Sequence, residues 1–270
     1  MKTANIHVLH TGQVYIDRAL AFEEKTLHPL PFTGWLRPAS KKSWVPVSSY
    51  LIEHPKGLLL IDTGWHEDMR SNPRKHLGRL SYSMFKGALP EGQSIREQLL
   101  QRGIRPTDLD YVVISHMHSD HISGVKHVAG AKKILTSELE WKAAHKDVGY
   151  TRSMWEGVDI TPAALHDIPH GPYRRGVDLF QDGTLYLVHT PGHSRGQLSA
   201  LVLTASGWVL LASDVGYAKA SFEQALLPGI KTSREEAAQS LRWAAAFGAR
   251  SDCAAVLANH DPVIRPHTIS

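Results

Sequence analysis

Side chains that bind metal ions gather in one short stretch of the sequence. Within residues 116–121, four of six positions carry such side chains, namely His116, His118, Asp120 and His121. Two imidazoles two residues apart on an extended segment can reach one borderline divalent ion, and the carboxylate and third imidazole can then serve a neighbouring ion. A helix would scatter the four groups around its axis, so we expect a loop. The chain has 17 histidines, but four ligand types in six positions are hard to attribute to chance.

Apolar runs precede this stretch and three other candidate ligands. Residues 111–114 predict a buried strand whose carboxyl end carries the cluster, which is where α/β folds place their chemistry. His193 follows the apolar run 185–188 and a Pro-Gly turn, Asp214 follows 208–211, and His260 follows 254–257. Any one of these could be a turn residue. Because four strand ends deliver metal-ligand residue types, we expect them to converge.

Most of the remaining histidines are interpreted as exposed or as hydrogen-bonded within the core. The histidines interpreted in this way are His7, His28, His54, His66, His76, His145 and His166.

The elements that must position the ligands form two similar halves. Residues 6–16, 44–53 and 57–62 predict strands, with a hairpin joining 50–53 to 58–61, and residues 198–203 and 208–211 predict a second hairpin. Capping boxes at residues 94–97 and 233–236 predict helices that end at Gly103 and near Phe247, and residues 137–144 have helical spacing. Strand pairs followed by helices, twice over, predict a single α/β domain spanning residues 1–270.

Asp62 directly follows four buried aliphatic residues. A carboxylate there is costly unless it is hydrogen-bonded, so Asp62 either caps a turn or supports the metal ligands from behind. The sequence favours the turn cap.

Two long irregular segments interrupt the pattern. Residues 17–43 are rich in proline and aromatic residues and form either a lid, a binding wall or a packed surface loop. The candidates for an apolar wall of the substrate pocket are Phe22, Phe32, Trp35 and Met154. Residues 65–92 predict a loop with a short helix.

Composition excludes several classes of protein. The net charge of +4 is spread along the chain, which argues against a nucleic-acid partner. The single cysteine, Cys253, excludes an internal disulfide, and no apolar run approaches the ~20 residues that span a bilayer. We therefore expect a soluble cytoplasmic protein without a membrane partner. Trp35 and Trp44 could pack on a second subunit, which would give a homodimer.

With these residues in hand, the chain resembles the metallo-β-lactamase superfamily over nearly its whole length. The resemblance implies an α/β fold, an αβ/βα four-layer sandwich with a dinuclear metal site at the sheet edge. It also implies a set of seven metal ligands: His116, His118 and His193 on one ion, Asp120, His121 and His260 on the other, and Asp214 bridging them. β-Lactamases of the superfamily generally lack an aspartate in the role of Asp214, so antibiotic hydrolysis is disfavoured.

Tyr217 narrows the resemblance. The segment from Asp214 to Tyr217 is similar to the Asp-x-x-Tyr of N-acyl homoserine lactone lactonases, in which the phenol hydrogen-bonds the substrate carbonyl. The alternative for Tyr217 is an ordinary half-buried tyrosine. Ser119 and the Ser123-Gly124 pair depart from the pattern of many such lactonases.

The resemblance implies a quorum-quenching hydrolase for a small-molecule ester or lactone. Two divalent ions, zinc by preference and manganese, iron or cobalt otherwise, would share a water and generate hydroxide at neutral pH. Asp120 would pass the proton of that water to the leaving oxygen, and Tyr217 would stabilise the oxyanion. The alternatives are a thioesterase of the glyoxalase II type, for which Arg195 and Lys219 could clamp the substrate, a phosphodiesterase, or a binding protein without activity.

Overall fold

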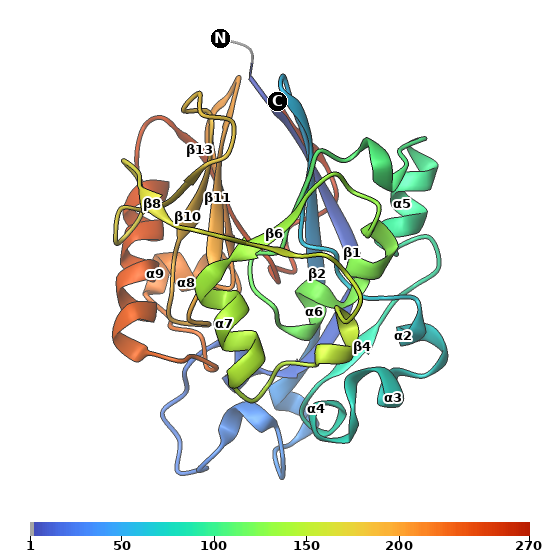
Figure 1. Ribbon diagram of the computed structural model, residues 1–270. Helices are drawn as coiled ribbons and strands as arrows, with labels where there is room; N and C mark the ends of the chain where they lie inside the picture. Colours follow the sequence, from blue (N-terminus) through green and yellow to red (C-terminus); the bar gives the residue numbers. More distant parts are fainter. Residues whose placement is uncertain (1–2) are drawn as a thin grey trace.

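Two β-sheets pack face to face, and helices cover both outer faces (Figure 1). The computed structural model describes residues 3–270, so the first two residues of the predicted domain lie outside the described part. Apolar side chains from both sheets meet in a shared core that includes Ile52, Leu187 and Leu211. The predicted four-layer α/β sandwich is confirmed.

The first sheet contains eight strands among the described residues, in the order β14-β1-β2-β3-β5-β6-β7, with β4 paired to β1. The strands are β1 (Asn5–Asp17), β2 (Lys42–His54), β3 (Gly57–Ile61), β4 (Lys86–Ala88), β5 (Tyr111–Val113), β6 (Ile134–Ser137), β7 (Thr161–Ala163) and β14 (Thr268–Ile269). The predicted hairpin is β2-β3, in which Leu51 lies opposite Leu60. From β3 to β7 neighbouring strands are parallel, so their carboxyl ends lie at one edge.

The second sheet contains six strands in the described chain, in the order β13-β12-β11-β10-β9-β8. The strands are β8 (His166–Asp167), β9 (Arg175–Asp178), β10 (Leu185–His189), β11 (Leu198–Thr204), β12 (Gly207–Ser213) and β13 (Cys253–Ala258). Strands β11 and β12 form the second predicted hairpin, and β12 runs parallel to β13. The residues after β12 and β13 therefore emerge at the same edge.

Helices close the outer faces. They are α1 (Arg18–Ala21), α2 (Asp68–Ser71), α3 (Pro73–Leu77), α4 (Arg79–Met84), α5 (Ile95–Gln101), α6 (Ser119–Ile122), α7 (Glu138–Lys146), α8 (Lys219–Gln224) and α9 (Arg234–Gly248), with 3-10 turns η1 (Pro31–Thr33), η2 (Ala39–Lys41), η3 (Pro106–Asp108), η4 (Ser123–Val128) and η5 (Arg152–Met154). Ser94 and Glu97 form the predicted capping box of α5, and Ser233 caps α9. Of the helices described, none combines the length and apolar character that crossing a membrane requires.

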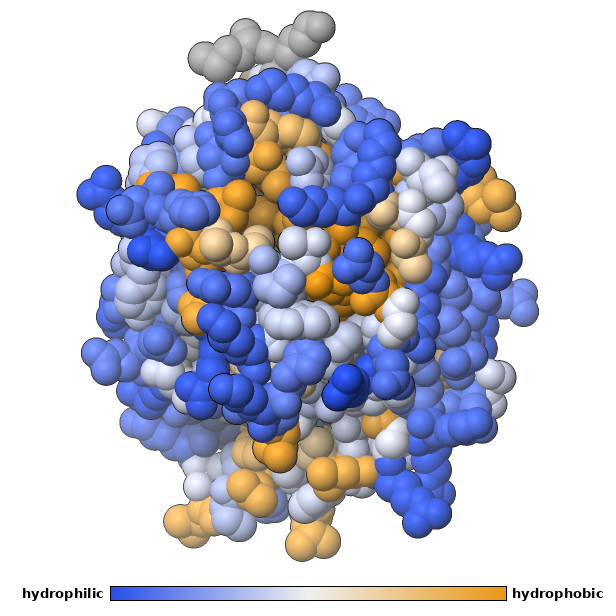
Figure 2. Space-filling model, viewed as in Figure 1, coloured by the Kyte–Doolittle hydropathy of each residue, from blue (hydrophilic) through white to orange (hydrophobic). Residues whose placement is uncertain are grey.

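The two irregular segments lie at one end of the molecule. The segment between β1 and β2 is mostly loop, whereas residues 65–92 hold α2, α3, α4 and β4 and so are more regular than predicted. Figure 2 shows apolar side chains at the lower end of the molecule, where Figure 1 shows the loop between β1 and β2. Leu27 and Leu36 of this loop are fully exposed.

Glu97 gives a pH-dependent prediction. Its pKa falls from 4.5 to about 2, chiefly because Arg70 donates two hydrogen bonds to the carboxylate. A pKa depressed in the folded state stabilises the fold above pH 4.5, and that stabilisation is lost as the pH falls toward 2. We expect Glu97→Gln to lower the free energy of unfolding by about 1 kcal/mol at neutral pH. Urea titrations should show that the difference in unfolding free energy between the variant and the wild type shrinks below pH 4.5. An equal difference at neutral pH and below pH 4.5 would contradict this prediction.

Candidate metal centre

The structure brings all seven predicted ligand side chains to one place at the sheet edge. They follow four strands: His116, His118, Asp120 and His121 after β5, His193 after β10, Asp214 after β12 and His260 after β13. Five of them have buried side chains, whereas His118 and Asp120 are half-buried, with 17% of the Asp120 side chain exposed. The residues converge as the strand-end pattern predicted.

One part of the local prediction was wrong. His116 and His118 lie in a loop, but Ser119–Ile122 form the short helix α6, which begins directly after His118. The peptide N–H groups of His121 and Ile122 both donate to the carbonyl of His118. A single helical turn does not scatter the ligands, because consecutive side chains about 100° apart still let Asp120 and His121 face one neighbouring point.

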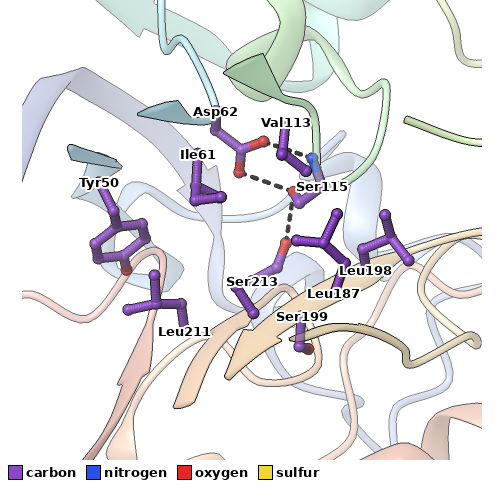
Figure 3. Close-up of a pocket in the computed structure, with 11 residues that line it drawn as sticks. Tyr50, Ile61, Asp62, Val113, Ser115, Leu187, Leu198, Ser199, Leu211 and Ser213 are labelled. Atoms are coloured by element: carbon purple, nitrogen blue, oxygen red, sulfur yellow. Dashed lines mark hydrogen bonds between the residues drawn. The ribbon is translucent and has the colours of Figure 1, made fainter. Parts of the chain in front are cut away.

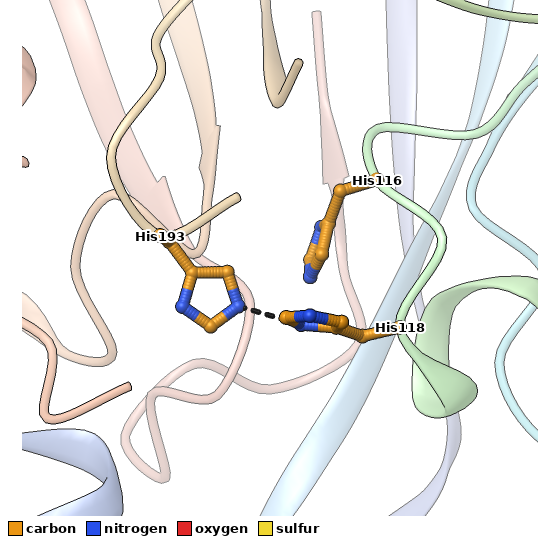
Figure 4. A group of neighbouring side chains, drawn as sticks. All are labelled: His116, His118 and His193. Atoms are coloured by element: carbon orange, nitrogen blue, oxygen red, sulfur yellow. Dashed lines mark hydrogen bonds between the residues drawn. The ribbon is translucent and has the colours of Figure 1, made fainter. Parts of the chain in front are cut away.

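Two groups of ligand atoms share this site. In one group, His116, His118 and His193 converge (Figure 4), with Nδ1 of His118 at 2.9 Å from Nε2 of His193. In the other group, Nε2 of His260 lies 3.3 Å and Nε2 of His121 lies 3.8 Å from Oδ2 of Asp120. Within each group, all ligand atoms lie within 4.8 Å of one another.

Asp214 lies between the two groups. Its Oδ2 is 3.4 Å from Nε2 of His193 and 4.0 Å from Nε2 of His116. Its Oδ1 is 3.4 Å from Nε2 of His121 and 3.3 Å from Nε2 of His260. Each carboxylate oxygen therefore faces one group, as a bridging ligand requires.

Four of the five histidines are held from behind by a contact at Nδ1, whereas Nδ1 of His118 faces His193. Nδ1 of His121 contacts Oδ2 of Asp62 at 2.8 Å, and Nδ1 of His116 lies 3.2 Å from the Ser115 hydroxyl. Backbone carbonyls hold the other two: Ile230 accepts from Nδ1 of His193 at 3.0 Å, and Pro46 accepts from Nδ1 of His260 at 2.8 Å. Such contacts fix the tautomer of a metal-binding histidine and leave Nε2 free for the ion.

Buried polar atoms test whether this donor set fits metal ions. Nε2 of His116, Nε2 of His121 and Oδ1 of Asp214 are buried and have no hydrogen-bond partner. Buried polar atoms almost always have partners, because an unsatisfied one costs about 1–3 kcal/mol. The three unpaired atoms face the common centre, so a pair of cations there would satisfy them, and nitrogen and carboxylate donors suit borderline divalent metals.

Electrostatics divide the histidines into two classes. Burial lowers the pKa of His116, His118 and His193, that of His193 to about 4. For His121 and His260, burial acts in the same direction, but nearby carboxylates outweigh it and raise the pKa. The first group is thus neutral and able to bind a metal at neutral pH, whereas the second sits in a strongly negative field that attracts cations.

Asp62 supports the metal ligands, so the turn-capping interpretation favoured by the sequence was wrong. Its carboxylate accepts from the backbone N–H and the hydroxyl of Ser115, and Ser213 donates to that hydroxyl (Figure 3). Asp62 and Ser213 both have positive φ angles, 59° and 51°, which cost energy outside glycine. These groups line a cavity of about 10 Å³ between the sheets. The polar network therefore connects His116 to His121 beneath the site.

Glu140 is a supporting residue that the sequence analysis missed. Its buried carboxylate accepts from the N–H of Met117, the N–H of Gly196, and the hydroxyls of Ser194 and Tyr150. It joins α7 to the loops that carry His116, His118 and His193. The signal was an acidic residue on the otherwise apolar face of the 137–144 helix, although its partners are remote in sequence.

A pocket of about 340 Å³ opens over the metal-ligand groups. Tyr217 lines it, with a ring stacked on His260 at 4.9 Å, and burial raises the pKa of its phenol well above 10. Asp120 also faces the pocket. One wall is apolar and consists of Val14, Ile16, Leu20, Phe32, Met84, Phe85, Val148 and Ile230.

Only one of the four predicted wall residues, Phe32, lines this pocket. Phe22 lines an adjoining hollow on the other side of Tyr217, because it follows α1 at a turn away from the pocket. Trp35 lies at the surface, where its indole N–H donates to Ser83, and Met154 is buried beneath a different hollow. Hydrophobicity made these residues candidates for the wall, but it gives no information on the direction in which their backbones turn.

The two basic residues considered for a substrate clamp point elsewhere. Arg195 pairs with Asp147 at 2.8 Å, and Lys219 pairs with Glu223 at 3.2 Å. Neither lines the pocket, whose basic lining residue is Lys231.

Glu140 leads to a stability prediction. A glutamine can accept at one oxygen only, so Glu140→Gln would leave buried donors facing its amide N–H groups. We expect a loss of about 2–4 kcal/mol in the free energy of unfolding of the metal-free protein, measured by urea denaturation. Glu138→Gln, on the exposed side of the same helix, is the matched control and should change by less than about 0.5 kcal/mol. Equal losses in the two variants would show that Glu140 does not join the loops.

Comparisons with known proteins agree with this geometry. The family model described as the metallo-beta-lactamase superfamily matches residues 43–245. The N-acyl homoserine lactonase AttM of Agrobacterium fabrum is 31% identical over 226 residues, which is 81% of this chain and 82% of that protein. An N-acyl homoserine lactonase of Bacillus cereus is 32% identical over 182 residues, 66% of this chain and 67% of the relative.

Solved structures share the fold. An N-acyl homoserine lactone hydrolase with N-hexanoyl-L-homoserine at its catalytic metal centre superimposes with a TM-score of 0.78 at 23% identity, covering 97% of this chain and 94% of that one. The matched family model, together with the two sheets and the edge they share, shows that the chain belongs to the metallo-beta-lactamase superfamily. Within this superfamily it is similar to N-acyl homoserine lactonases.

Proposed function

We propose that this protein is a dinuclear metal-dependent hydrolase that opens the lactone ring of N-acyl homoserine lactones. The observation that carries the proposal is the position of Asp214, whose two oxygens face two separate groups of ligand atoms. The names of the relatives support the lactone as substrate.

His116, His118 and His193 would hold one ion, Asp120, His121 and His260 the other, and Asp214 both. Zinc is the metal we propose, with manganese, iron or cobalt as alternatives. When bound, a metal pair of this kind supplies Lewis acidity and lowers the pKa of water to about 7.

The residues of the chain then bind the substrate and move one proton. Asp120 faces the pocket and is the partly exposed carboxylate of the site, so it can accept a proton from the attacking water and return it to the leaving ring oxygen. The carbonyl–oxygen bond of the ring breaks, and an N-acyl homoserine with a free carboxylate results. Tyr217 lines the same pocket and can donate its phenolic hydrogen to the carbonyl oxygen as negative charge develops.

The pocket has two chemically different sides. His118, Asp120, His193, Asp214 and His260 make a polar floor, and the apolar wall described above stands beside it. A volume of about 340 Å³ lies in the range of small-molecule sites. A polar lactone head over the floor and an apolar acyl chain along the wall match this division.

The other hydrolase candidates fit less well. A glyoxalase II type thioesterase needs basic groups for its anionic substrate, but Arg195 and Lys219 are each paired with an acidic residue, and neither of them lines the pocket. A phosphodiesterase remains a prediction that a substrate panel tests. The homodimer also stays a prediction, consistent with Trp35 and Trp44, which are 39% and 45% exposed.

Metal removal tests the ligand assignment. Dialysis against a chelator should abolish lactone hydrolysis, because no side chain in the pocket is activated as a nucleophile, and zinc, manganese or cobalt should restore it. His118→Ala should lose most activity and retain fewer ions by elemental analysis. Full activity in that variant would refute the assignment of His118.

Substrate preference separates the hydrolase classes. N-acyl homoserine lactones should be hydrolysed with a higher kcat/KM than a glutathione thioester or a phosphodiester, because the pocket pairs an apolar wall with a metal floor. A higher kcat/KM for the thioester or the phosphodiester would overturn the lactonase proposal and leave the metal assignment standing.

Tyr217→Phe tests the phenol. Loss of a sole oxyanion donor typically costs 10²- to 10³-fold, and a metal that shares the role should reduce the loss in kcat to about 10- to 100-fold. Tyr186→Phe is the control, since Tyr186 lies in β10 and packs in the core beside α9. The role of Tyr217 would be refuted by an unchanged kcat on a lactone.

A further inference from the structure

A second cluster of metal-ligand side chains lies outside the site described above. His66 and His76, interpreted from the sequence as unremarkable, lie beside Asp68, and the ligand atoms of the three residues lie within 4.8 Å of one another. Oδ2 of Asp68 is 3.3 Å from Nδ1 of His66 and 3.9 Å from Nδ1 of His76. The three residues come from the start of the 65–92 segment, around α2 and α3.

The surrounding residues fix the two imidazoles. The Ser123 hydroxyl accepts the backbone N–H of His66 at 2.9 Å and lies 2.6 Å from Nε2 of His76, so Nδ1 of His76 is the ring nitrogen turned toward Asp68. The backbone N–H of Asp68 donates to Nδ1 of His66, so this nitrogen carries no proton, and an ion bound to it would replace that hydrogen bond. The ring of His127 stacks on His66, with centroids 4.1 Å apart and planes 2° apart. Both ligand rings are thus oriented without a metal.

The carboxylate of Asp68 lies at the point where the two imidazoles converge, and there it favours a cation over an anion. The hollow around them has a volume of about 420 Å³, and its lining includes Lys75 and Lys126. The amine of Lys126 donates to the carbonyl of Ser153 at 2.7 Å, which fixes its position and leaves its positive charge in place. An anion bound between the imidazoles would contact the carboxylate of Asp68, whereas a cation would be coordinated by it.

We propose that His66, Asp68 and His76 form a third divalent-metal site, separate from the pair at the sheet edge. Two imidazoles and one carboxylate select zinc, nickel, copper or cobalt over magnesium and calcium, and the open hollow leaves positions for water. Ser123 begins η4, directly after the helix that carries Asp120 and His121. An ion in this site joins the 65–92 segment to the segment that carries the catalytic ligands. The proposal does not depend on the reaction catalysed.

Metal stoichiometry tests the proposal. Chelator-treated full-length protein is dialysed against buffered micromolar zinc, and bound zinc is measured by elemental analysis. We expect three ions per chain in the wild type and one fewer in both Asp68→Asn and His76→Gln, with lactone hydrolysis retained. Asp68 is 63% exposed, so its variant removes a ligand without disturbing the core. His118→Ala should instead lose ions from the sheet-edge pair and keep the third.

Matched controls exclude general surface binding. His166→Gln removes an exposed histidine from the edge strand β8 and should leave the count unchanged. Two ions per chain in the wild type would overturn the proposal, as would an unchanged count in Asp68→Asn. A loss of one ion in His166→Gln would show that zinc binds exposed histidines generally, which also overturns it.

Discussion

The site depends on the free-energy cost of burying the Asp214 carboxylate among four imidazoles. Asp214 is 2% exposed, and removing such charged and polar groups from water costs several kcal/mol unless partners compensate. The chain supplies only part of this compensation, because Oδ1 of Asp214 and the Nε2 atoms of His116 and His121 have no hydrogen-bond partners. A protein that keeps such atoms facing one point gains their missing interactions from bound cations, so metal binding and local stability are coupled.

The fold keeps these atoms in position through contacts on their far side. The sheets bring the ends of β5, β10, β12 and β13 to one edge, but strand ends alone do not orient side chains. Orientation comes from the outer hydrogen bonds to the imidazoles, and two buried carboxylates hold the loops themselves. Asp62 joins the ligand loop after β5 to His121, and Glu140 joins that loop to the turn carrying His193. At Gly192 of that turn, a Cβ atom would lie 2.2 Å from the backbone nitrogen of Ala237, so only glycine lets α9 pack there.

The sequence predicted the parts of this arrangement that depend on local pattern. Apolar runs such as 185–188, the hairpins and the caps at Ser94 and Ser233 are each decided within a few residues, and all appear in the structure. The residues that were misread depend on remote partners. The role of Asp62 is set by Ser115 and His121, more than 50 residues away, and that of Glu140 by Ser194. Spacing in the sequence likewise gave no sign that Asp68 lies beside His76 or that Ser123 holds both His66 and His76.

The division between strand ends and loops separates the chemistry from the choice of substrate. The proposed metal ligands follow core strands, and most are tied at their second nitrogen or through buried carboxylates, so few substitutions there keep the geometry. The apolar wall comes largely from β1, the 17–43 loop and residues 84–85, whose side chains can change in size without touching a ligand. Phe32 shows this plainly, because it belongs to a loop whose neighbours Leu27 and Leu36 are fully exposed. In the proposed lactonase, the sheets would therefore constrain the reaction, whereas loops that can change in sequence would set the length and shape of the acyl group accepted.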